Sequence, residues 1–126
     1  PWNSYAVRTD EPDFPQKQDP ETLIELIQIN QEIFSRRFKG SPIKRIKRRG
    51  LLRNVAVALG NSGNTQAIPI LLKVLGDEEP LIRAHVVWAL GELAGPEVLP
   101  AIREKLNNES EKIVLAELER VVVRFV

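Results

Sequence analysis

The stretch DEEPLIRAHVVWALGELAGPEVLPAIREKL, residues 77–106, decides the expected fold of this 126-residue chain. Its first half has apolar residues at helical spacing, which predicts an inner helix with a wide apolar face. These residues are Ile82, Val86, Ala89, Leu90 and Leu93. Its second half predicts an outer helix that turns its apolar residues inward and its charged residues outward. The inward set is Val98, Leu99, Ile102 and Leu106, and the outward set is Arg103, Glu104 and Lys105.

The same pattern occurs twice, because residues 50–80 match residues 81–111 when they are shifted by 31 positions. The matches include the Leu-Gly pairs at 59–60 and 90–91 and the prolines at 69 and 100. A third copy begins near residue 111 and extends over one helix. Repeats of this length are typical of stacked arrays, in which no unit can bury its apolar face alone. We therefore expect an all-α fold of about six to eight short-repeat helices, an α-solenoid, in which Ala58 and Ala89 let helices approach closely.

Residues 20–126 are expected to form this helical-repeat domain. Asp19 followed by Pro20 predicts the start of its first helix. Asn30 predicts a second start, and Gly40 is expected to end that second helix. Ser41 and the proline after it predict a further start, which leads into the first repeat.

Residues 1–19 contain several prolines and no apolar period, so they predict an extended arm or linker. Trp2, Tyr5 and Phe14 lie in this arm and need a surface that covers them. That surface is either the repeat domain itself or a preceding domain. The chain begins at Pro1 and contains no Met, so we expect it to be a piece of a longer protein.

The composition argues against catalysis within this chain. There is no Cys, which excludes disulfides, thiolate metal sites and Cys nucleophiles here. The single imidazole, His85, lies within an expected core helix and is predicted to be packed. We therefore expect no catalytic residue, no metal ligand and no cofactor in this chain. No membrane span or secretory segment is visible. We expect a cytoplasmic protein without a membrane partner.

The net charge of +1 hides a strong asymmetry along the sequence. Residues 33–76 contain ten Lys or Arg and no acid, whereas the rest of the chain has eight basic and seventeen acidic residues. Such a separation indicates a polyanionic partner, although a charge run is also compatible with a solvated helix face.

The basic residues concentrate around KGSPIKRIKRRGLLRN, residues 39–54. Ile43 and Ile46 are expected to hold this segment against the repeats, so that its Lys and Arg side chains form one exposed ridge. Gly50 is expected to permit a bend between the charged turn and the buried helix. Few aromatic groups lie nearby, so we expect contacts with the phosphates of a polyanion rather than base readout. The predicted phosphate-binding residues are Arg36, Arg37, Lys39, Lys44, Arg45, Lys47, Arg48, Arg49 and Arg53.

Two resemblances extend this interpretation. Residues 77–106 resemble a HEAT repeat of the short, bilin-lyase-related type. The segment RRFKGSPIKRIKRRGLLRNVAVALGN, residues 36–61, is similar to the start of the C-terminal region of epoxyqueuosine reductases. The initial PWN, residues 1–3, resembles the residues directly after the last cluster cysteine in that family.

The resemblance implies a larger oxidoreductase of queuosine biosynthesis, with this chain as its C-terminal repeat region. In that family a cobalamin-binding domain and an iron–sulfur domain with two 4Fe-4S clusters reduce epoxyqueuosine in tRNA to queuosine. The expected partners are therefore tRNA and the preceding catalytic and iron–sulfur domains. Both cofactors would belong to those domains.

Two other functions stay open at this stage. The repeats could form a scaffold for another protein, or a structural cap on a neighbouring domain. The charge asymmetry favours RNA docking, and the aromatic residues of the arm favour the cap.

Overall fold

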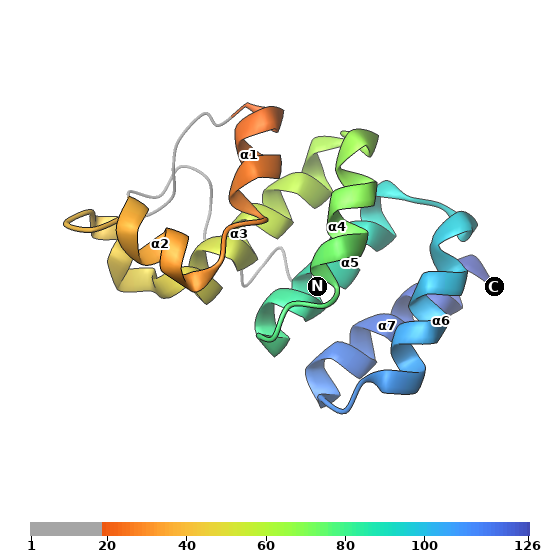
Figure 1. The fold of residues 1–126 in the computed structure, drawn as a ribbon. Helices are drawn as coiled ribbons and strands as arrows, with labels where there is room; N and C mark the ends of the chain where they lie inside the picture. Colours follow the sequence, from red (N-terminus) through yellow and green to blue (C-terminus); the bar gives the residue numbers. More distant parts are fainter. Residues whose placement is uncertain (1–18) are drawn as a thin grey trace.

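The computed structural model describes residues 19–126, and every regular element over this part of the chain is helical (Figure 1). The α-helices are α1 (Pro20–Leu26), α2 (Gln31–Arg37), α3 (Lys47–Ser62), α4 (Ile68–Val74), α5 (Pro80–Leu93), α6 (Leu99–Asn108) and α7 (Lys112–Phe125). Three short 3-10 helices precede α3, α4 and α6, and they are η2 (Pro42–Ile46), η3 (Thr65–Ala67) and η4 (Pro96–Val98). The expected all-α repeat fold is confirmed.

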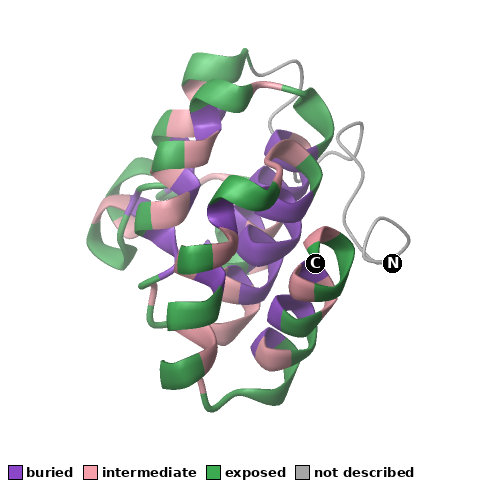
Figure 2. Cartoon of the chain, turned by 90° about the vertical axis from the view of Figure 1, so that its right-hand side faces the viewer, coloured by how far each residue is buried: buried purple, intermediate pink, exposed green. Residues whose placement is uncertain are grey.

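The helices form two layers. The long helices α3, α5 and α7 lie side by side, and α5 is the middle one. The shorter helices α1, α4 and α6 pack on α3, α5 and α7 respectively. Figure 2 shows buried residues on the facing sides of the helices and exposed residues on the outside. Because α5 contacts α3, α4 and α7, almost its whole length is buried.

The pairing of helices differs from the order expected from the sequence. The 31-residue spacing is present, since η3 begins at residue 65 and η4 at residue 96. However, α4 packs mainly against the following α5, and α6 against the following α7. Each structural unit is therefore an outer helix followed by an inner one. The last helix, α7 (Lys112–Phe125), is the one helix of the third copy expected near residue 111, and α6 packs against it.

Glycine permits the close approach of neighbouring inner helices. A Cβ atom added to Gly60 would lie 2.5 Å from a ring carbon of Trp88 and 3.1 Å from the Cα of Ala89. At the equivalent position in the next unit, a Cβ on Gly91 would lie 2.9 Å from a methyl group of Val121. Ala89 contributes to the contact as expected, but Ala58 is only half-buried, so the repeated Leu-Gly pair has the larger role.

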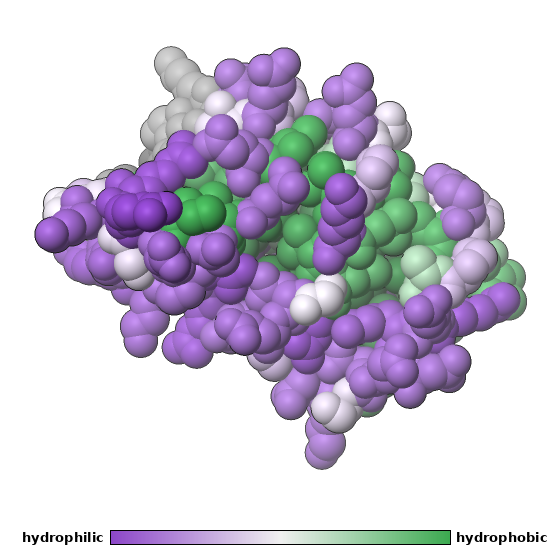
Figure 3. Space-filling view, in the orientation of Figure 1, coloured by the Kyte–Doolittle hydropathy of each residue, from purple (hydrophilic) through white to green (hydrophobic). Residues whose placement is uncertain are grey.

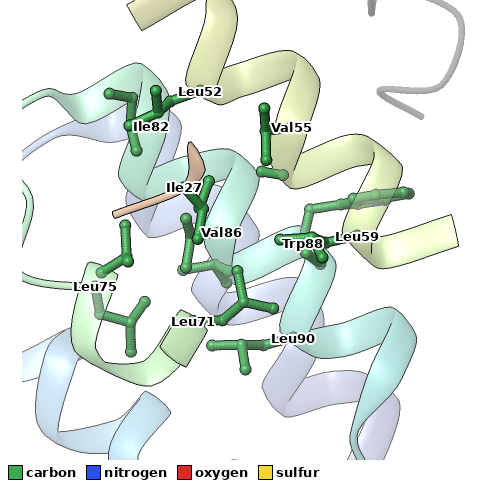
Figure 4. Packing of buried hydrophobic residues seen from close by; sticks show 14 of the residues in the cluster. Ile27, Leu52, Val55, Leu59, Leu71, Leu75, Ile82, Val86, Trp88 and Leu90 are labelled. Atoms are coloured by element: carbon green, nitrogen blue, oxygen red, sulfur yellow. The ribbon is translucent and has the colours of Figure 1, made fainter. Parts of the chain in front are cut away.

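One apolar core joins the two layers (Figure 4). Leu52, Val55 and Leu59 of α3 face α5, and Ile27 and Leu71 enter from the outer layer. Trp88 is only 4% exposed, which supports a packing role for its ring.

The helix starts upstream of the repeats are confirmed. Asp19 accepts a hydrogen bond from the Thr22 amide at 2.7 Å, and Asn30 accepts one from the Ile33 amide at 2.8 Å. Gly40 adopts a positive φ of 77° just after α2, as a residue that ends a helix often does.

The expectations for Trp2, Tyr5 and Phe14 fall on residues 1–18, which lie outside the described part of the chain.

Candidate nucleic-acid interface

The basic segment is held against the core by a short 3-10 helix. The Ser41 hydroxyl accepts a hydrogen bond from the Ile43 amide at 3.2 Å and starts η2. Ile43 and Ile46 are half-buried and pack against the core, as expected. Figure 3 shows hydrophilic side chains gathered over this end of the molecule, whereas hydrophobic atoms reach the surface near its centre.

The chain changes direction at Lys47, the first residue of α3, directly after η2. Lys47 has φ 63° and ψ 166°, and it is the one residue other than glycine with positive φ among residues 19–126. This backbone region is essentially restricted to glycine, so Lys47 is strained. The expected bend at Gly50 is wrong, because Gly50 lies inside the regular helix α3 and its backbone is packed against Ile46.

Arg48 does not belong to the exposed surface, and this corrects the predicted ridge. Its side chain is 10% exposed, and its guanidinium forms a bidentate ion pair with the equally buried Asp77. Its Nε also donates to the Ile29 carbonyl at 2.9 Å. Arg48 therefore ties the α1–α2 junction to the loop before α5. The sequence could not reveal this role, because Asp77 follows Arg48 by twenty-nine positions.

The second repeat has an equivalent ion pair. Arg83 near the start of α5 binds Glu109 before α7 through two hydrogen bonds, at 2.9 and 2.8 Å. It also donates to the Asp77 carbonyl at 2.8 Å. The Arg83 hydrogen bond holds the pKa of Glu109 below its ordinary value. Asp77 and Glu109 are thus structural acids, and each joins one inner helix to the next.

Two predicted ridge residues have acidic neighbours from outside the basic block. Arg37 forms an ion pair with Glu25, and Arg36 lies 3.7 Å from Glu32. Arg37 also lies 5.8 Å from the centre of the Phe38 ring. All four charged side chains are well exposed, so these pairs are weak and solvated.

Three other predicted residues have backbone or side-chain partners. Lys44 Nζ lies 3.3 Å from the Ser35 carbonyl near the end of α2, and Arg45 Nε donates to the Pro42 carbonyl at 3.4 Å. Both side chains remain exposed. Arg53 is half-buried, and its Nε donates to Oδ1 of the Asn54 side chain at 3.1 Å.

Lys39, Lys47 and Arg49 are exposed, and no acid of residues 19–126 forms an ion pair with them. Lys47 and Arg49 line a pocket of about 240 Å³. Arg48, Gln31 and Glu79 form the rest of its wall. Gln31 comes from α2, and Glu79 is the residue before α5. The pattern of basic residues does not point to either of them.

The remaining polar residues do not form a recognisable catalytic or metal centre within residues 19–126. His85 is 4% exposed, and its Nδ1 lies 2.8 Å from the Leu81 carbonyl. Burial lowers the pKa of His85 to about 4. No three His, Cys, Asp or Glu residues of the described chain cluster closely enough to hold a metal ion. Among the helices described here, none has the length and apolar character needed to cross a membrane.

Comparison with known proteins gives consistent results. The family model described as HEAT repeats matches residues 48–122. The epoxyqueuosine reductase of Xanthomonas campestris is 43% identical over 95 residues, which cover 73% of this chain and 27% of that protein. The Yersinia pestis enzyme of the same name is 32% identical over 115 residues, which cover 90% of this chain and 28% of that protein.

Solved structures of epoxyqueuosine reductases share the fold. The Bacillus subtilis enzyme superposes with a TM-score of 0.76 at 23% identity, covering 88% of this chain and 31% of that one. A second structure is of epoxyqueuosine reductase with an epoxyqueuosine-modified tRNA-Tyr stem loop. It superposes with a TM-score of 0.75 at 24% identity, covering 85% of this chain and 30% of that one. This chain thus spans between a quarter and a third of the length of these proteins. The chain therefore belongs to the HEAT repeat family, and it matches a helical part of epoxyqueuosine reductases in both sequence and fold.

Proposed function

We propose that this chain is a non-catalytic HEAT-repeat domain that docks tRNA, within a larger enzyme that resembles epoxyqueuosine reductase. Two findings support the proposal. The curated relatives bear that enzyme name, and a protein of this fold has been solved with a tRNA stem loop. A cytoplasmic location would follow from action on tRNA.

The observation that carries the docking role is the set of exposed cations around the start of α3. Lys39, Lys47 and Arg49 have no acidic partner within residues 19–126, and Lys44 and Arg45 extend the same surface. Such side chains attract phosphate oxygens, and they fix the position of a nucleic acid without reading its bases. Arg48 supports this surface from below through its bond to Asp77.

The chemistry of the larger enzyme would lie outside this chain. It contains no Cys, so it cannot provide thiolate ligands for an iron–sulfur cluster. We therefore assign the clusters and the cobalamin of such an enzyme to other segments, which would be further partners of this domain.

The test replaces Lys44, Lys47 and Arg49 together with Gln and measures binding to a tRNA anticodon stem loop at several salt concentrations. The surface location of these residues predicts stability changes within about 0.5 kcal/mol for each substitution. Each lost phosphate contact should flatten the slope of log affinity against log salt by about 0.7 to 0.9.

A matched control replaces Glu104 and Glu119 with Gln, because both are exposed acids on the opposite part of the array. The control should leave binding almost unchanged. If the triple variant binds the stem loop like the parent at every salt concentration, the basic surface is only a solvated face.

A protein-interaction scaffold is the second candidate. The large exposed hydrophobic side chains of residues 19–126 all lie in α7 or at its end, at Ile113, Val123 and Val126. This placement would suit contact with another protein or a neighbouring domain. Retained tRNA binding in the triple variant would favour this candidate.

A further inference from the structure

The pocket of about 240 Å³ at the start of α3 has both basic and acidic side chains in its lining. It is lined by Lys47, Arg48 and Arg49 together with Gln31 and Glu79. Three separate segments meet there: the start of α2, the start of α3 and the residue before α5.

Two of the three cations are available to a ligand. Arg48 is committed to Asp77 and to the Ile29 carbonyl. Lys47 and Arg49 are exposed and have no ion pair with any residue of the described chain. They can therefore bind one phosphate group without first breaking an internal contact.

Glu79 and Gln31 give the pocket hydrogen-bond acceptors. No residue within 19–126 donates to the Glu79 carboxylate, although the Glu79 amide is bound to Asp77 at 3.0 Å. Gln31 uses its amide nitrogen to bind Ser35 at 2.9 Å, which leaves its carbonyl oxygen as an acceptor. A carboxylate in this place repels a simple anion, but it accepts strongly from a hydroxyl group.

The ligand must therefore carry both an anion and a hydroxyl donor. A ribonucleotide unit of an RNA chain has this combination, and its 2′-hydroxyl is the group that DNA lacks. The pocket volume of about 240 Å³ is below the range of roughly 300–1,000 Å³ in which small molecules are usually enclosed. This size suits one unit of a polymer that is held elsewhere as well.

We propose that this pocket binds one ribonucleotide of the RNA backbone, with its phosphate on Lys47 and Arg49 and its 2′-hydroxyl donating to Glu79. The inference rests on the proposed RNA docking and adds a preference for ribose to it. Glu79 is then a specificity residue, which selects RNA among polyanions.

The experiment compares an RNA stem loop with the same stem loop carrying 2′-fluoro in place of every 2′-hydroxyl. The fluoro analogue keeps the A-form shape and loses the donor. For the 126-residue chain we expect the analogue to bind about tenfold more weakly, as for one lost hydrogen bond to a charged group.

Variants assign this difference to the pocket. Glu79→Ala should bring the affinity ratio of the two stem loops close to one. Glu78→Ala is the matched control, because Glu78 is an exposed neighbouring acid that does not line the pocket, and it should keep the parental ratio. The double variant Lys47→Gln and Arg49→Gln should weaken both stem loops and flatten the salt dependence.

The outcomes separate the two proposals. If the parent binds both stem loops equally while the double variant weakens both, the ribose contact is wrong and phosphate docking stands. A parental preference that survives Glu79→Ala also refutes the role of Glu79. If the double variant changes nothing, both this inference and the basic docking surface fail.

Discussion

Arg48 and Asp77 form a buried ion pair directly beneath the exposed basic side chains. A charge removed from water is tolerated only when its partners are in place, so each residue depends on the other. The neighbouring residues at 47 and 49 have the same charge and are exposed. Of these three consecutive basic residues, Arg48 stabilises the fold, whereas Lys47 and Arg49 face the solvent.

Replacing Arg48 with Met should destabilise the fold strongly. It leaves the Asp77 carboxylate buried without its cation and removes the donor to the Ile29 carbonyl. The expected loss is about 3–5 kcal/mol of unfolding free energy. Urea titration monitored by circular dichroism measures it, with Arg49→Met as a control that should change stability by less than about 0.5 kcal/mol. Equal stability of the two variants would contradict the structural role of Arg48.

Lys47→Gly should stabilise the chain, in contrast to most glycine substitutions. Glycine adopts φ 63° and ψ 166° without strain, and the strain of another residue there costs about 1–3 kcal/mol. The gain is reduced by the greater freedom of glycine in the unfolded chain, about 0.5–1 kcal/mol. Thermal melts of Lys47→Gly and Lys47→Gln separate the backbone effect from the loss of charge. If Lys47→Gly has a lower melting temperature than Lys47→Gln, the backbone at Lys47 is not strained.

His85 should make the free energy of unfolding depend on pH between pH 5 and pH 7, where most carboxylates are already ionised. Its pKa falls from 6.5 to about 4 on folding, because burial disfavours the charged ring. Below pH 6.5 the unfolded chain therefore binds a proton that the folded chain excludes, and stability decreases as the pH falls towards 4. Between pH 7 and pH 5 we expect a loss of about 2 kcal/mol from this residue.

The check is a set of urea titrations between pH 5 and 7 on the parent and on His85→Gln. Gln can hydrogen-bond but does not titrate, so its stability should be almost constant over this interval. A parent whose stability is equally constant would show that the imidazole takes up its proton in the folded state.

At the scale of the elements, the inner helices are spaced by the repeated glycines. Gly60 sets the distance between α3 and α5, and Gly91 sets the distance between α5 and α7. The polar pairs Arg48–Asp77 and Arg83–Glu109 join the same helices near their starts. Each inner helix is therefore fixed to the next by an apolar contact and by an ion pair.

Gly60→Ala should cost more stability than Gly91→Ala. The new methyl group meets the Trp88 ring and the Ala89 backbone, neither of which can move without displacing α5. At Gly91 the obstacle is a single methyl group of Val121. Overpacking at Gly60 should cost about 1–3 kcal/mol, partly offset by the better helix propensity of Ala. Chemical unfolding of both variants measures which substitution costs more stability. A Gly60→Ala variant as stable as the parent would refute the close contact between α3 and α5.

At the scale of the whole molecule, the sequence predicted the fold well and the candidate site only in part. Helical periodicity, capping residues and the 31-residue repeat depend on neighbours along the chain, so Asp19, Asn30 and the Leu-Gly pairs could be interpreted directly. The environment of each cation depends on residues far away in sequence. Asp77 withdraws Arg48 from the surface, and Glu79 enters a pocket with residues from α2 and α3. Neither contact produces a periodic pattern in the sequence from which it could be predicted.

The layered packing also has a consequence for the order in which the chain can fold during synthesis. The apolar face of α3 is covered mainly by α5, whose last residue is thirty-one positions beyond the end of α3. At a translation rate of about 5–20 residues per second, α3 waits a few seconds for its partner. The many positive charges at its start keep this nascent helix hydrated and repel any other copy of the segment that comes close during that interval. The basic segment would thus protect the growing chain from aggregation until its partner helix is made.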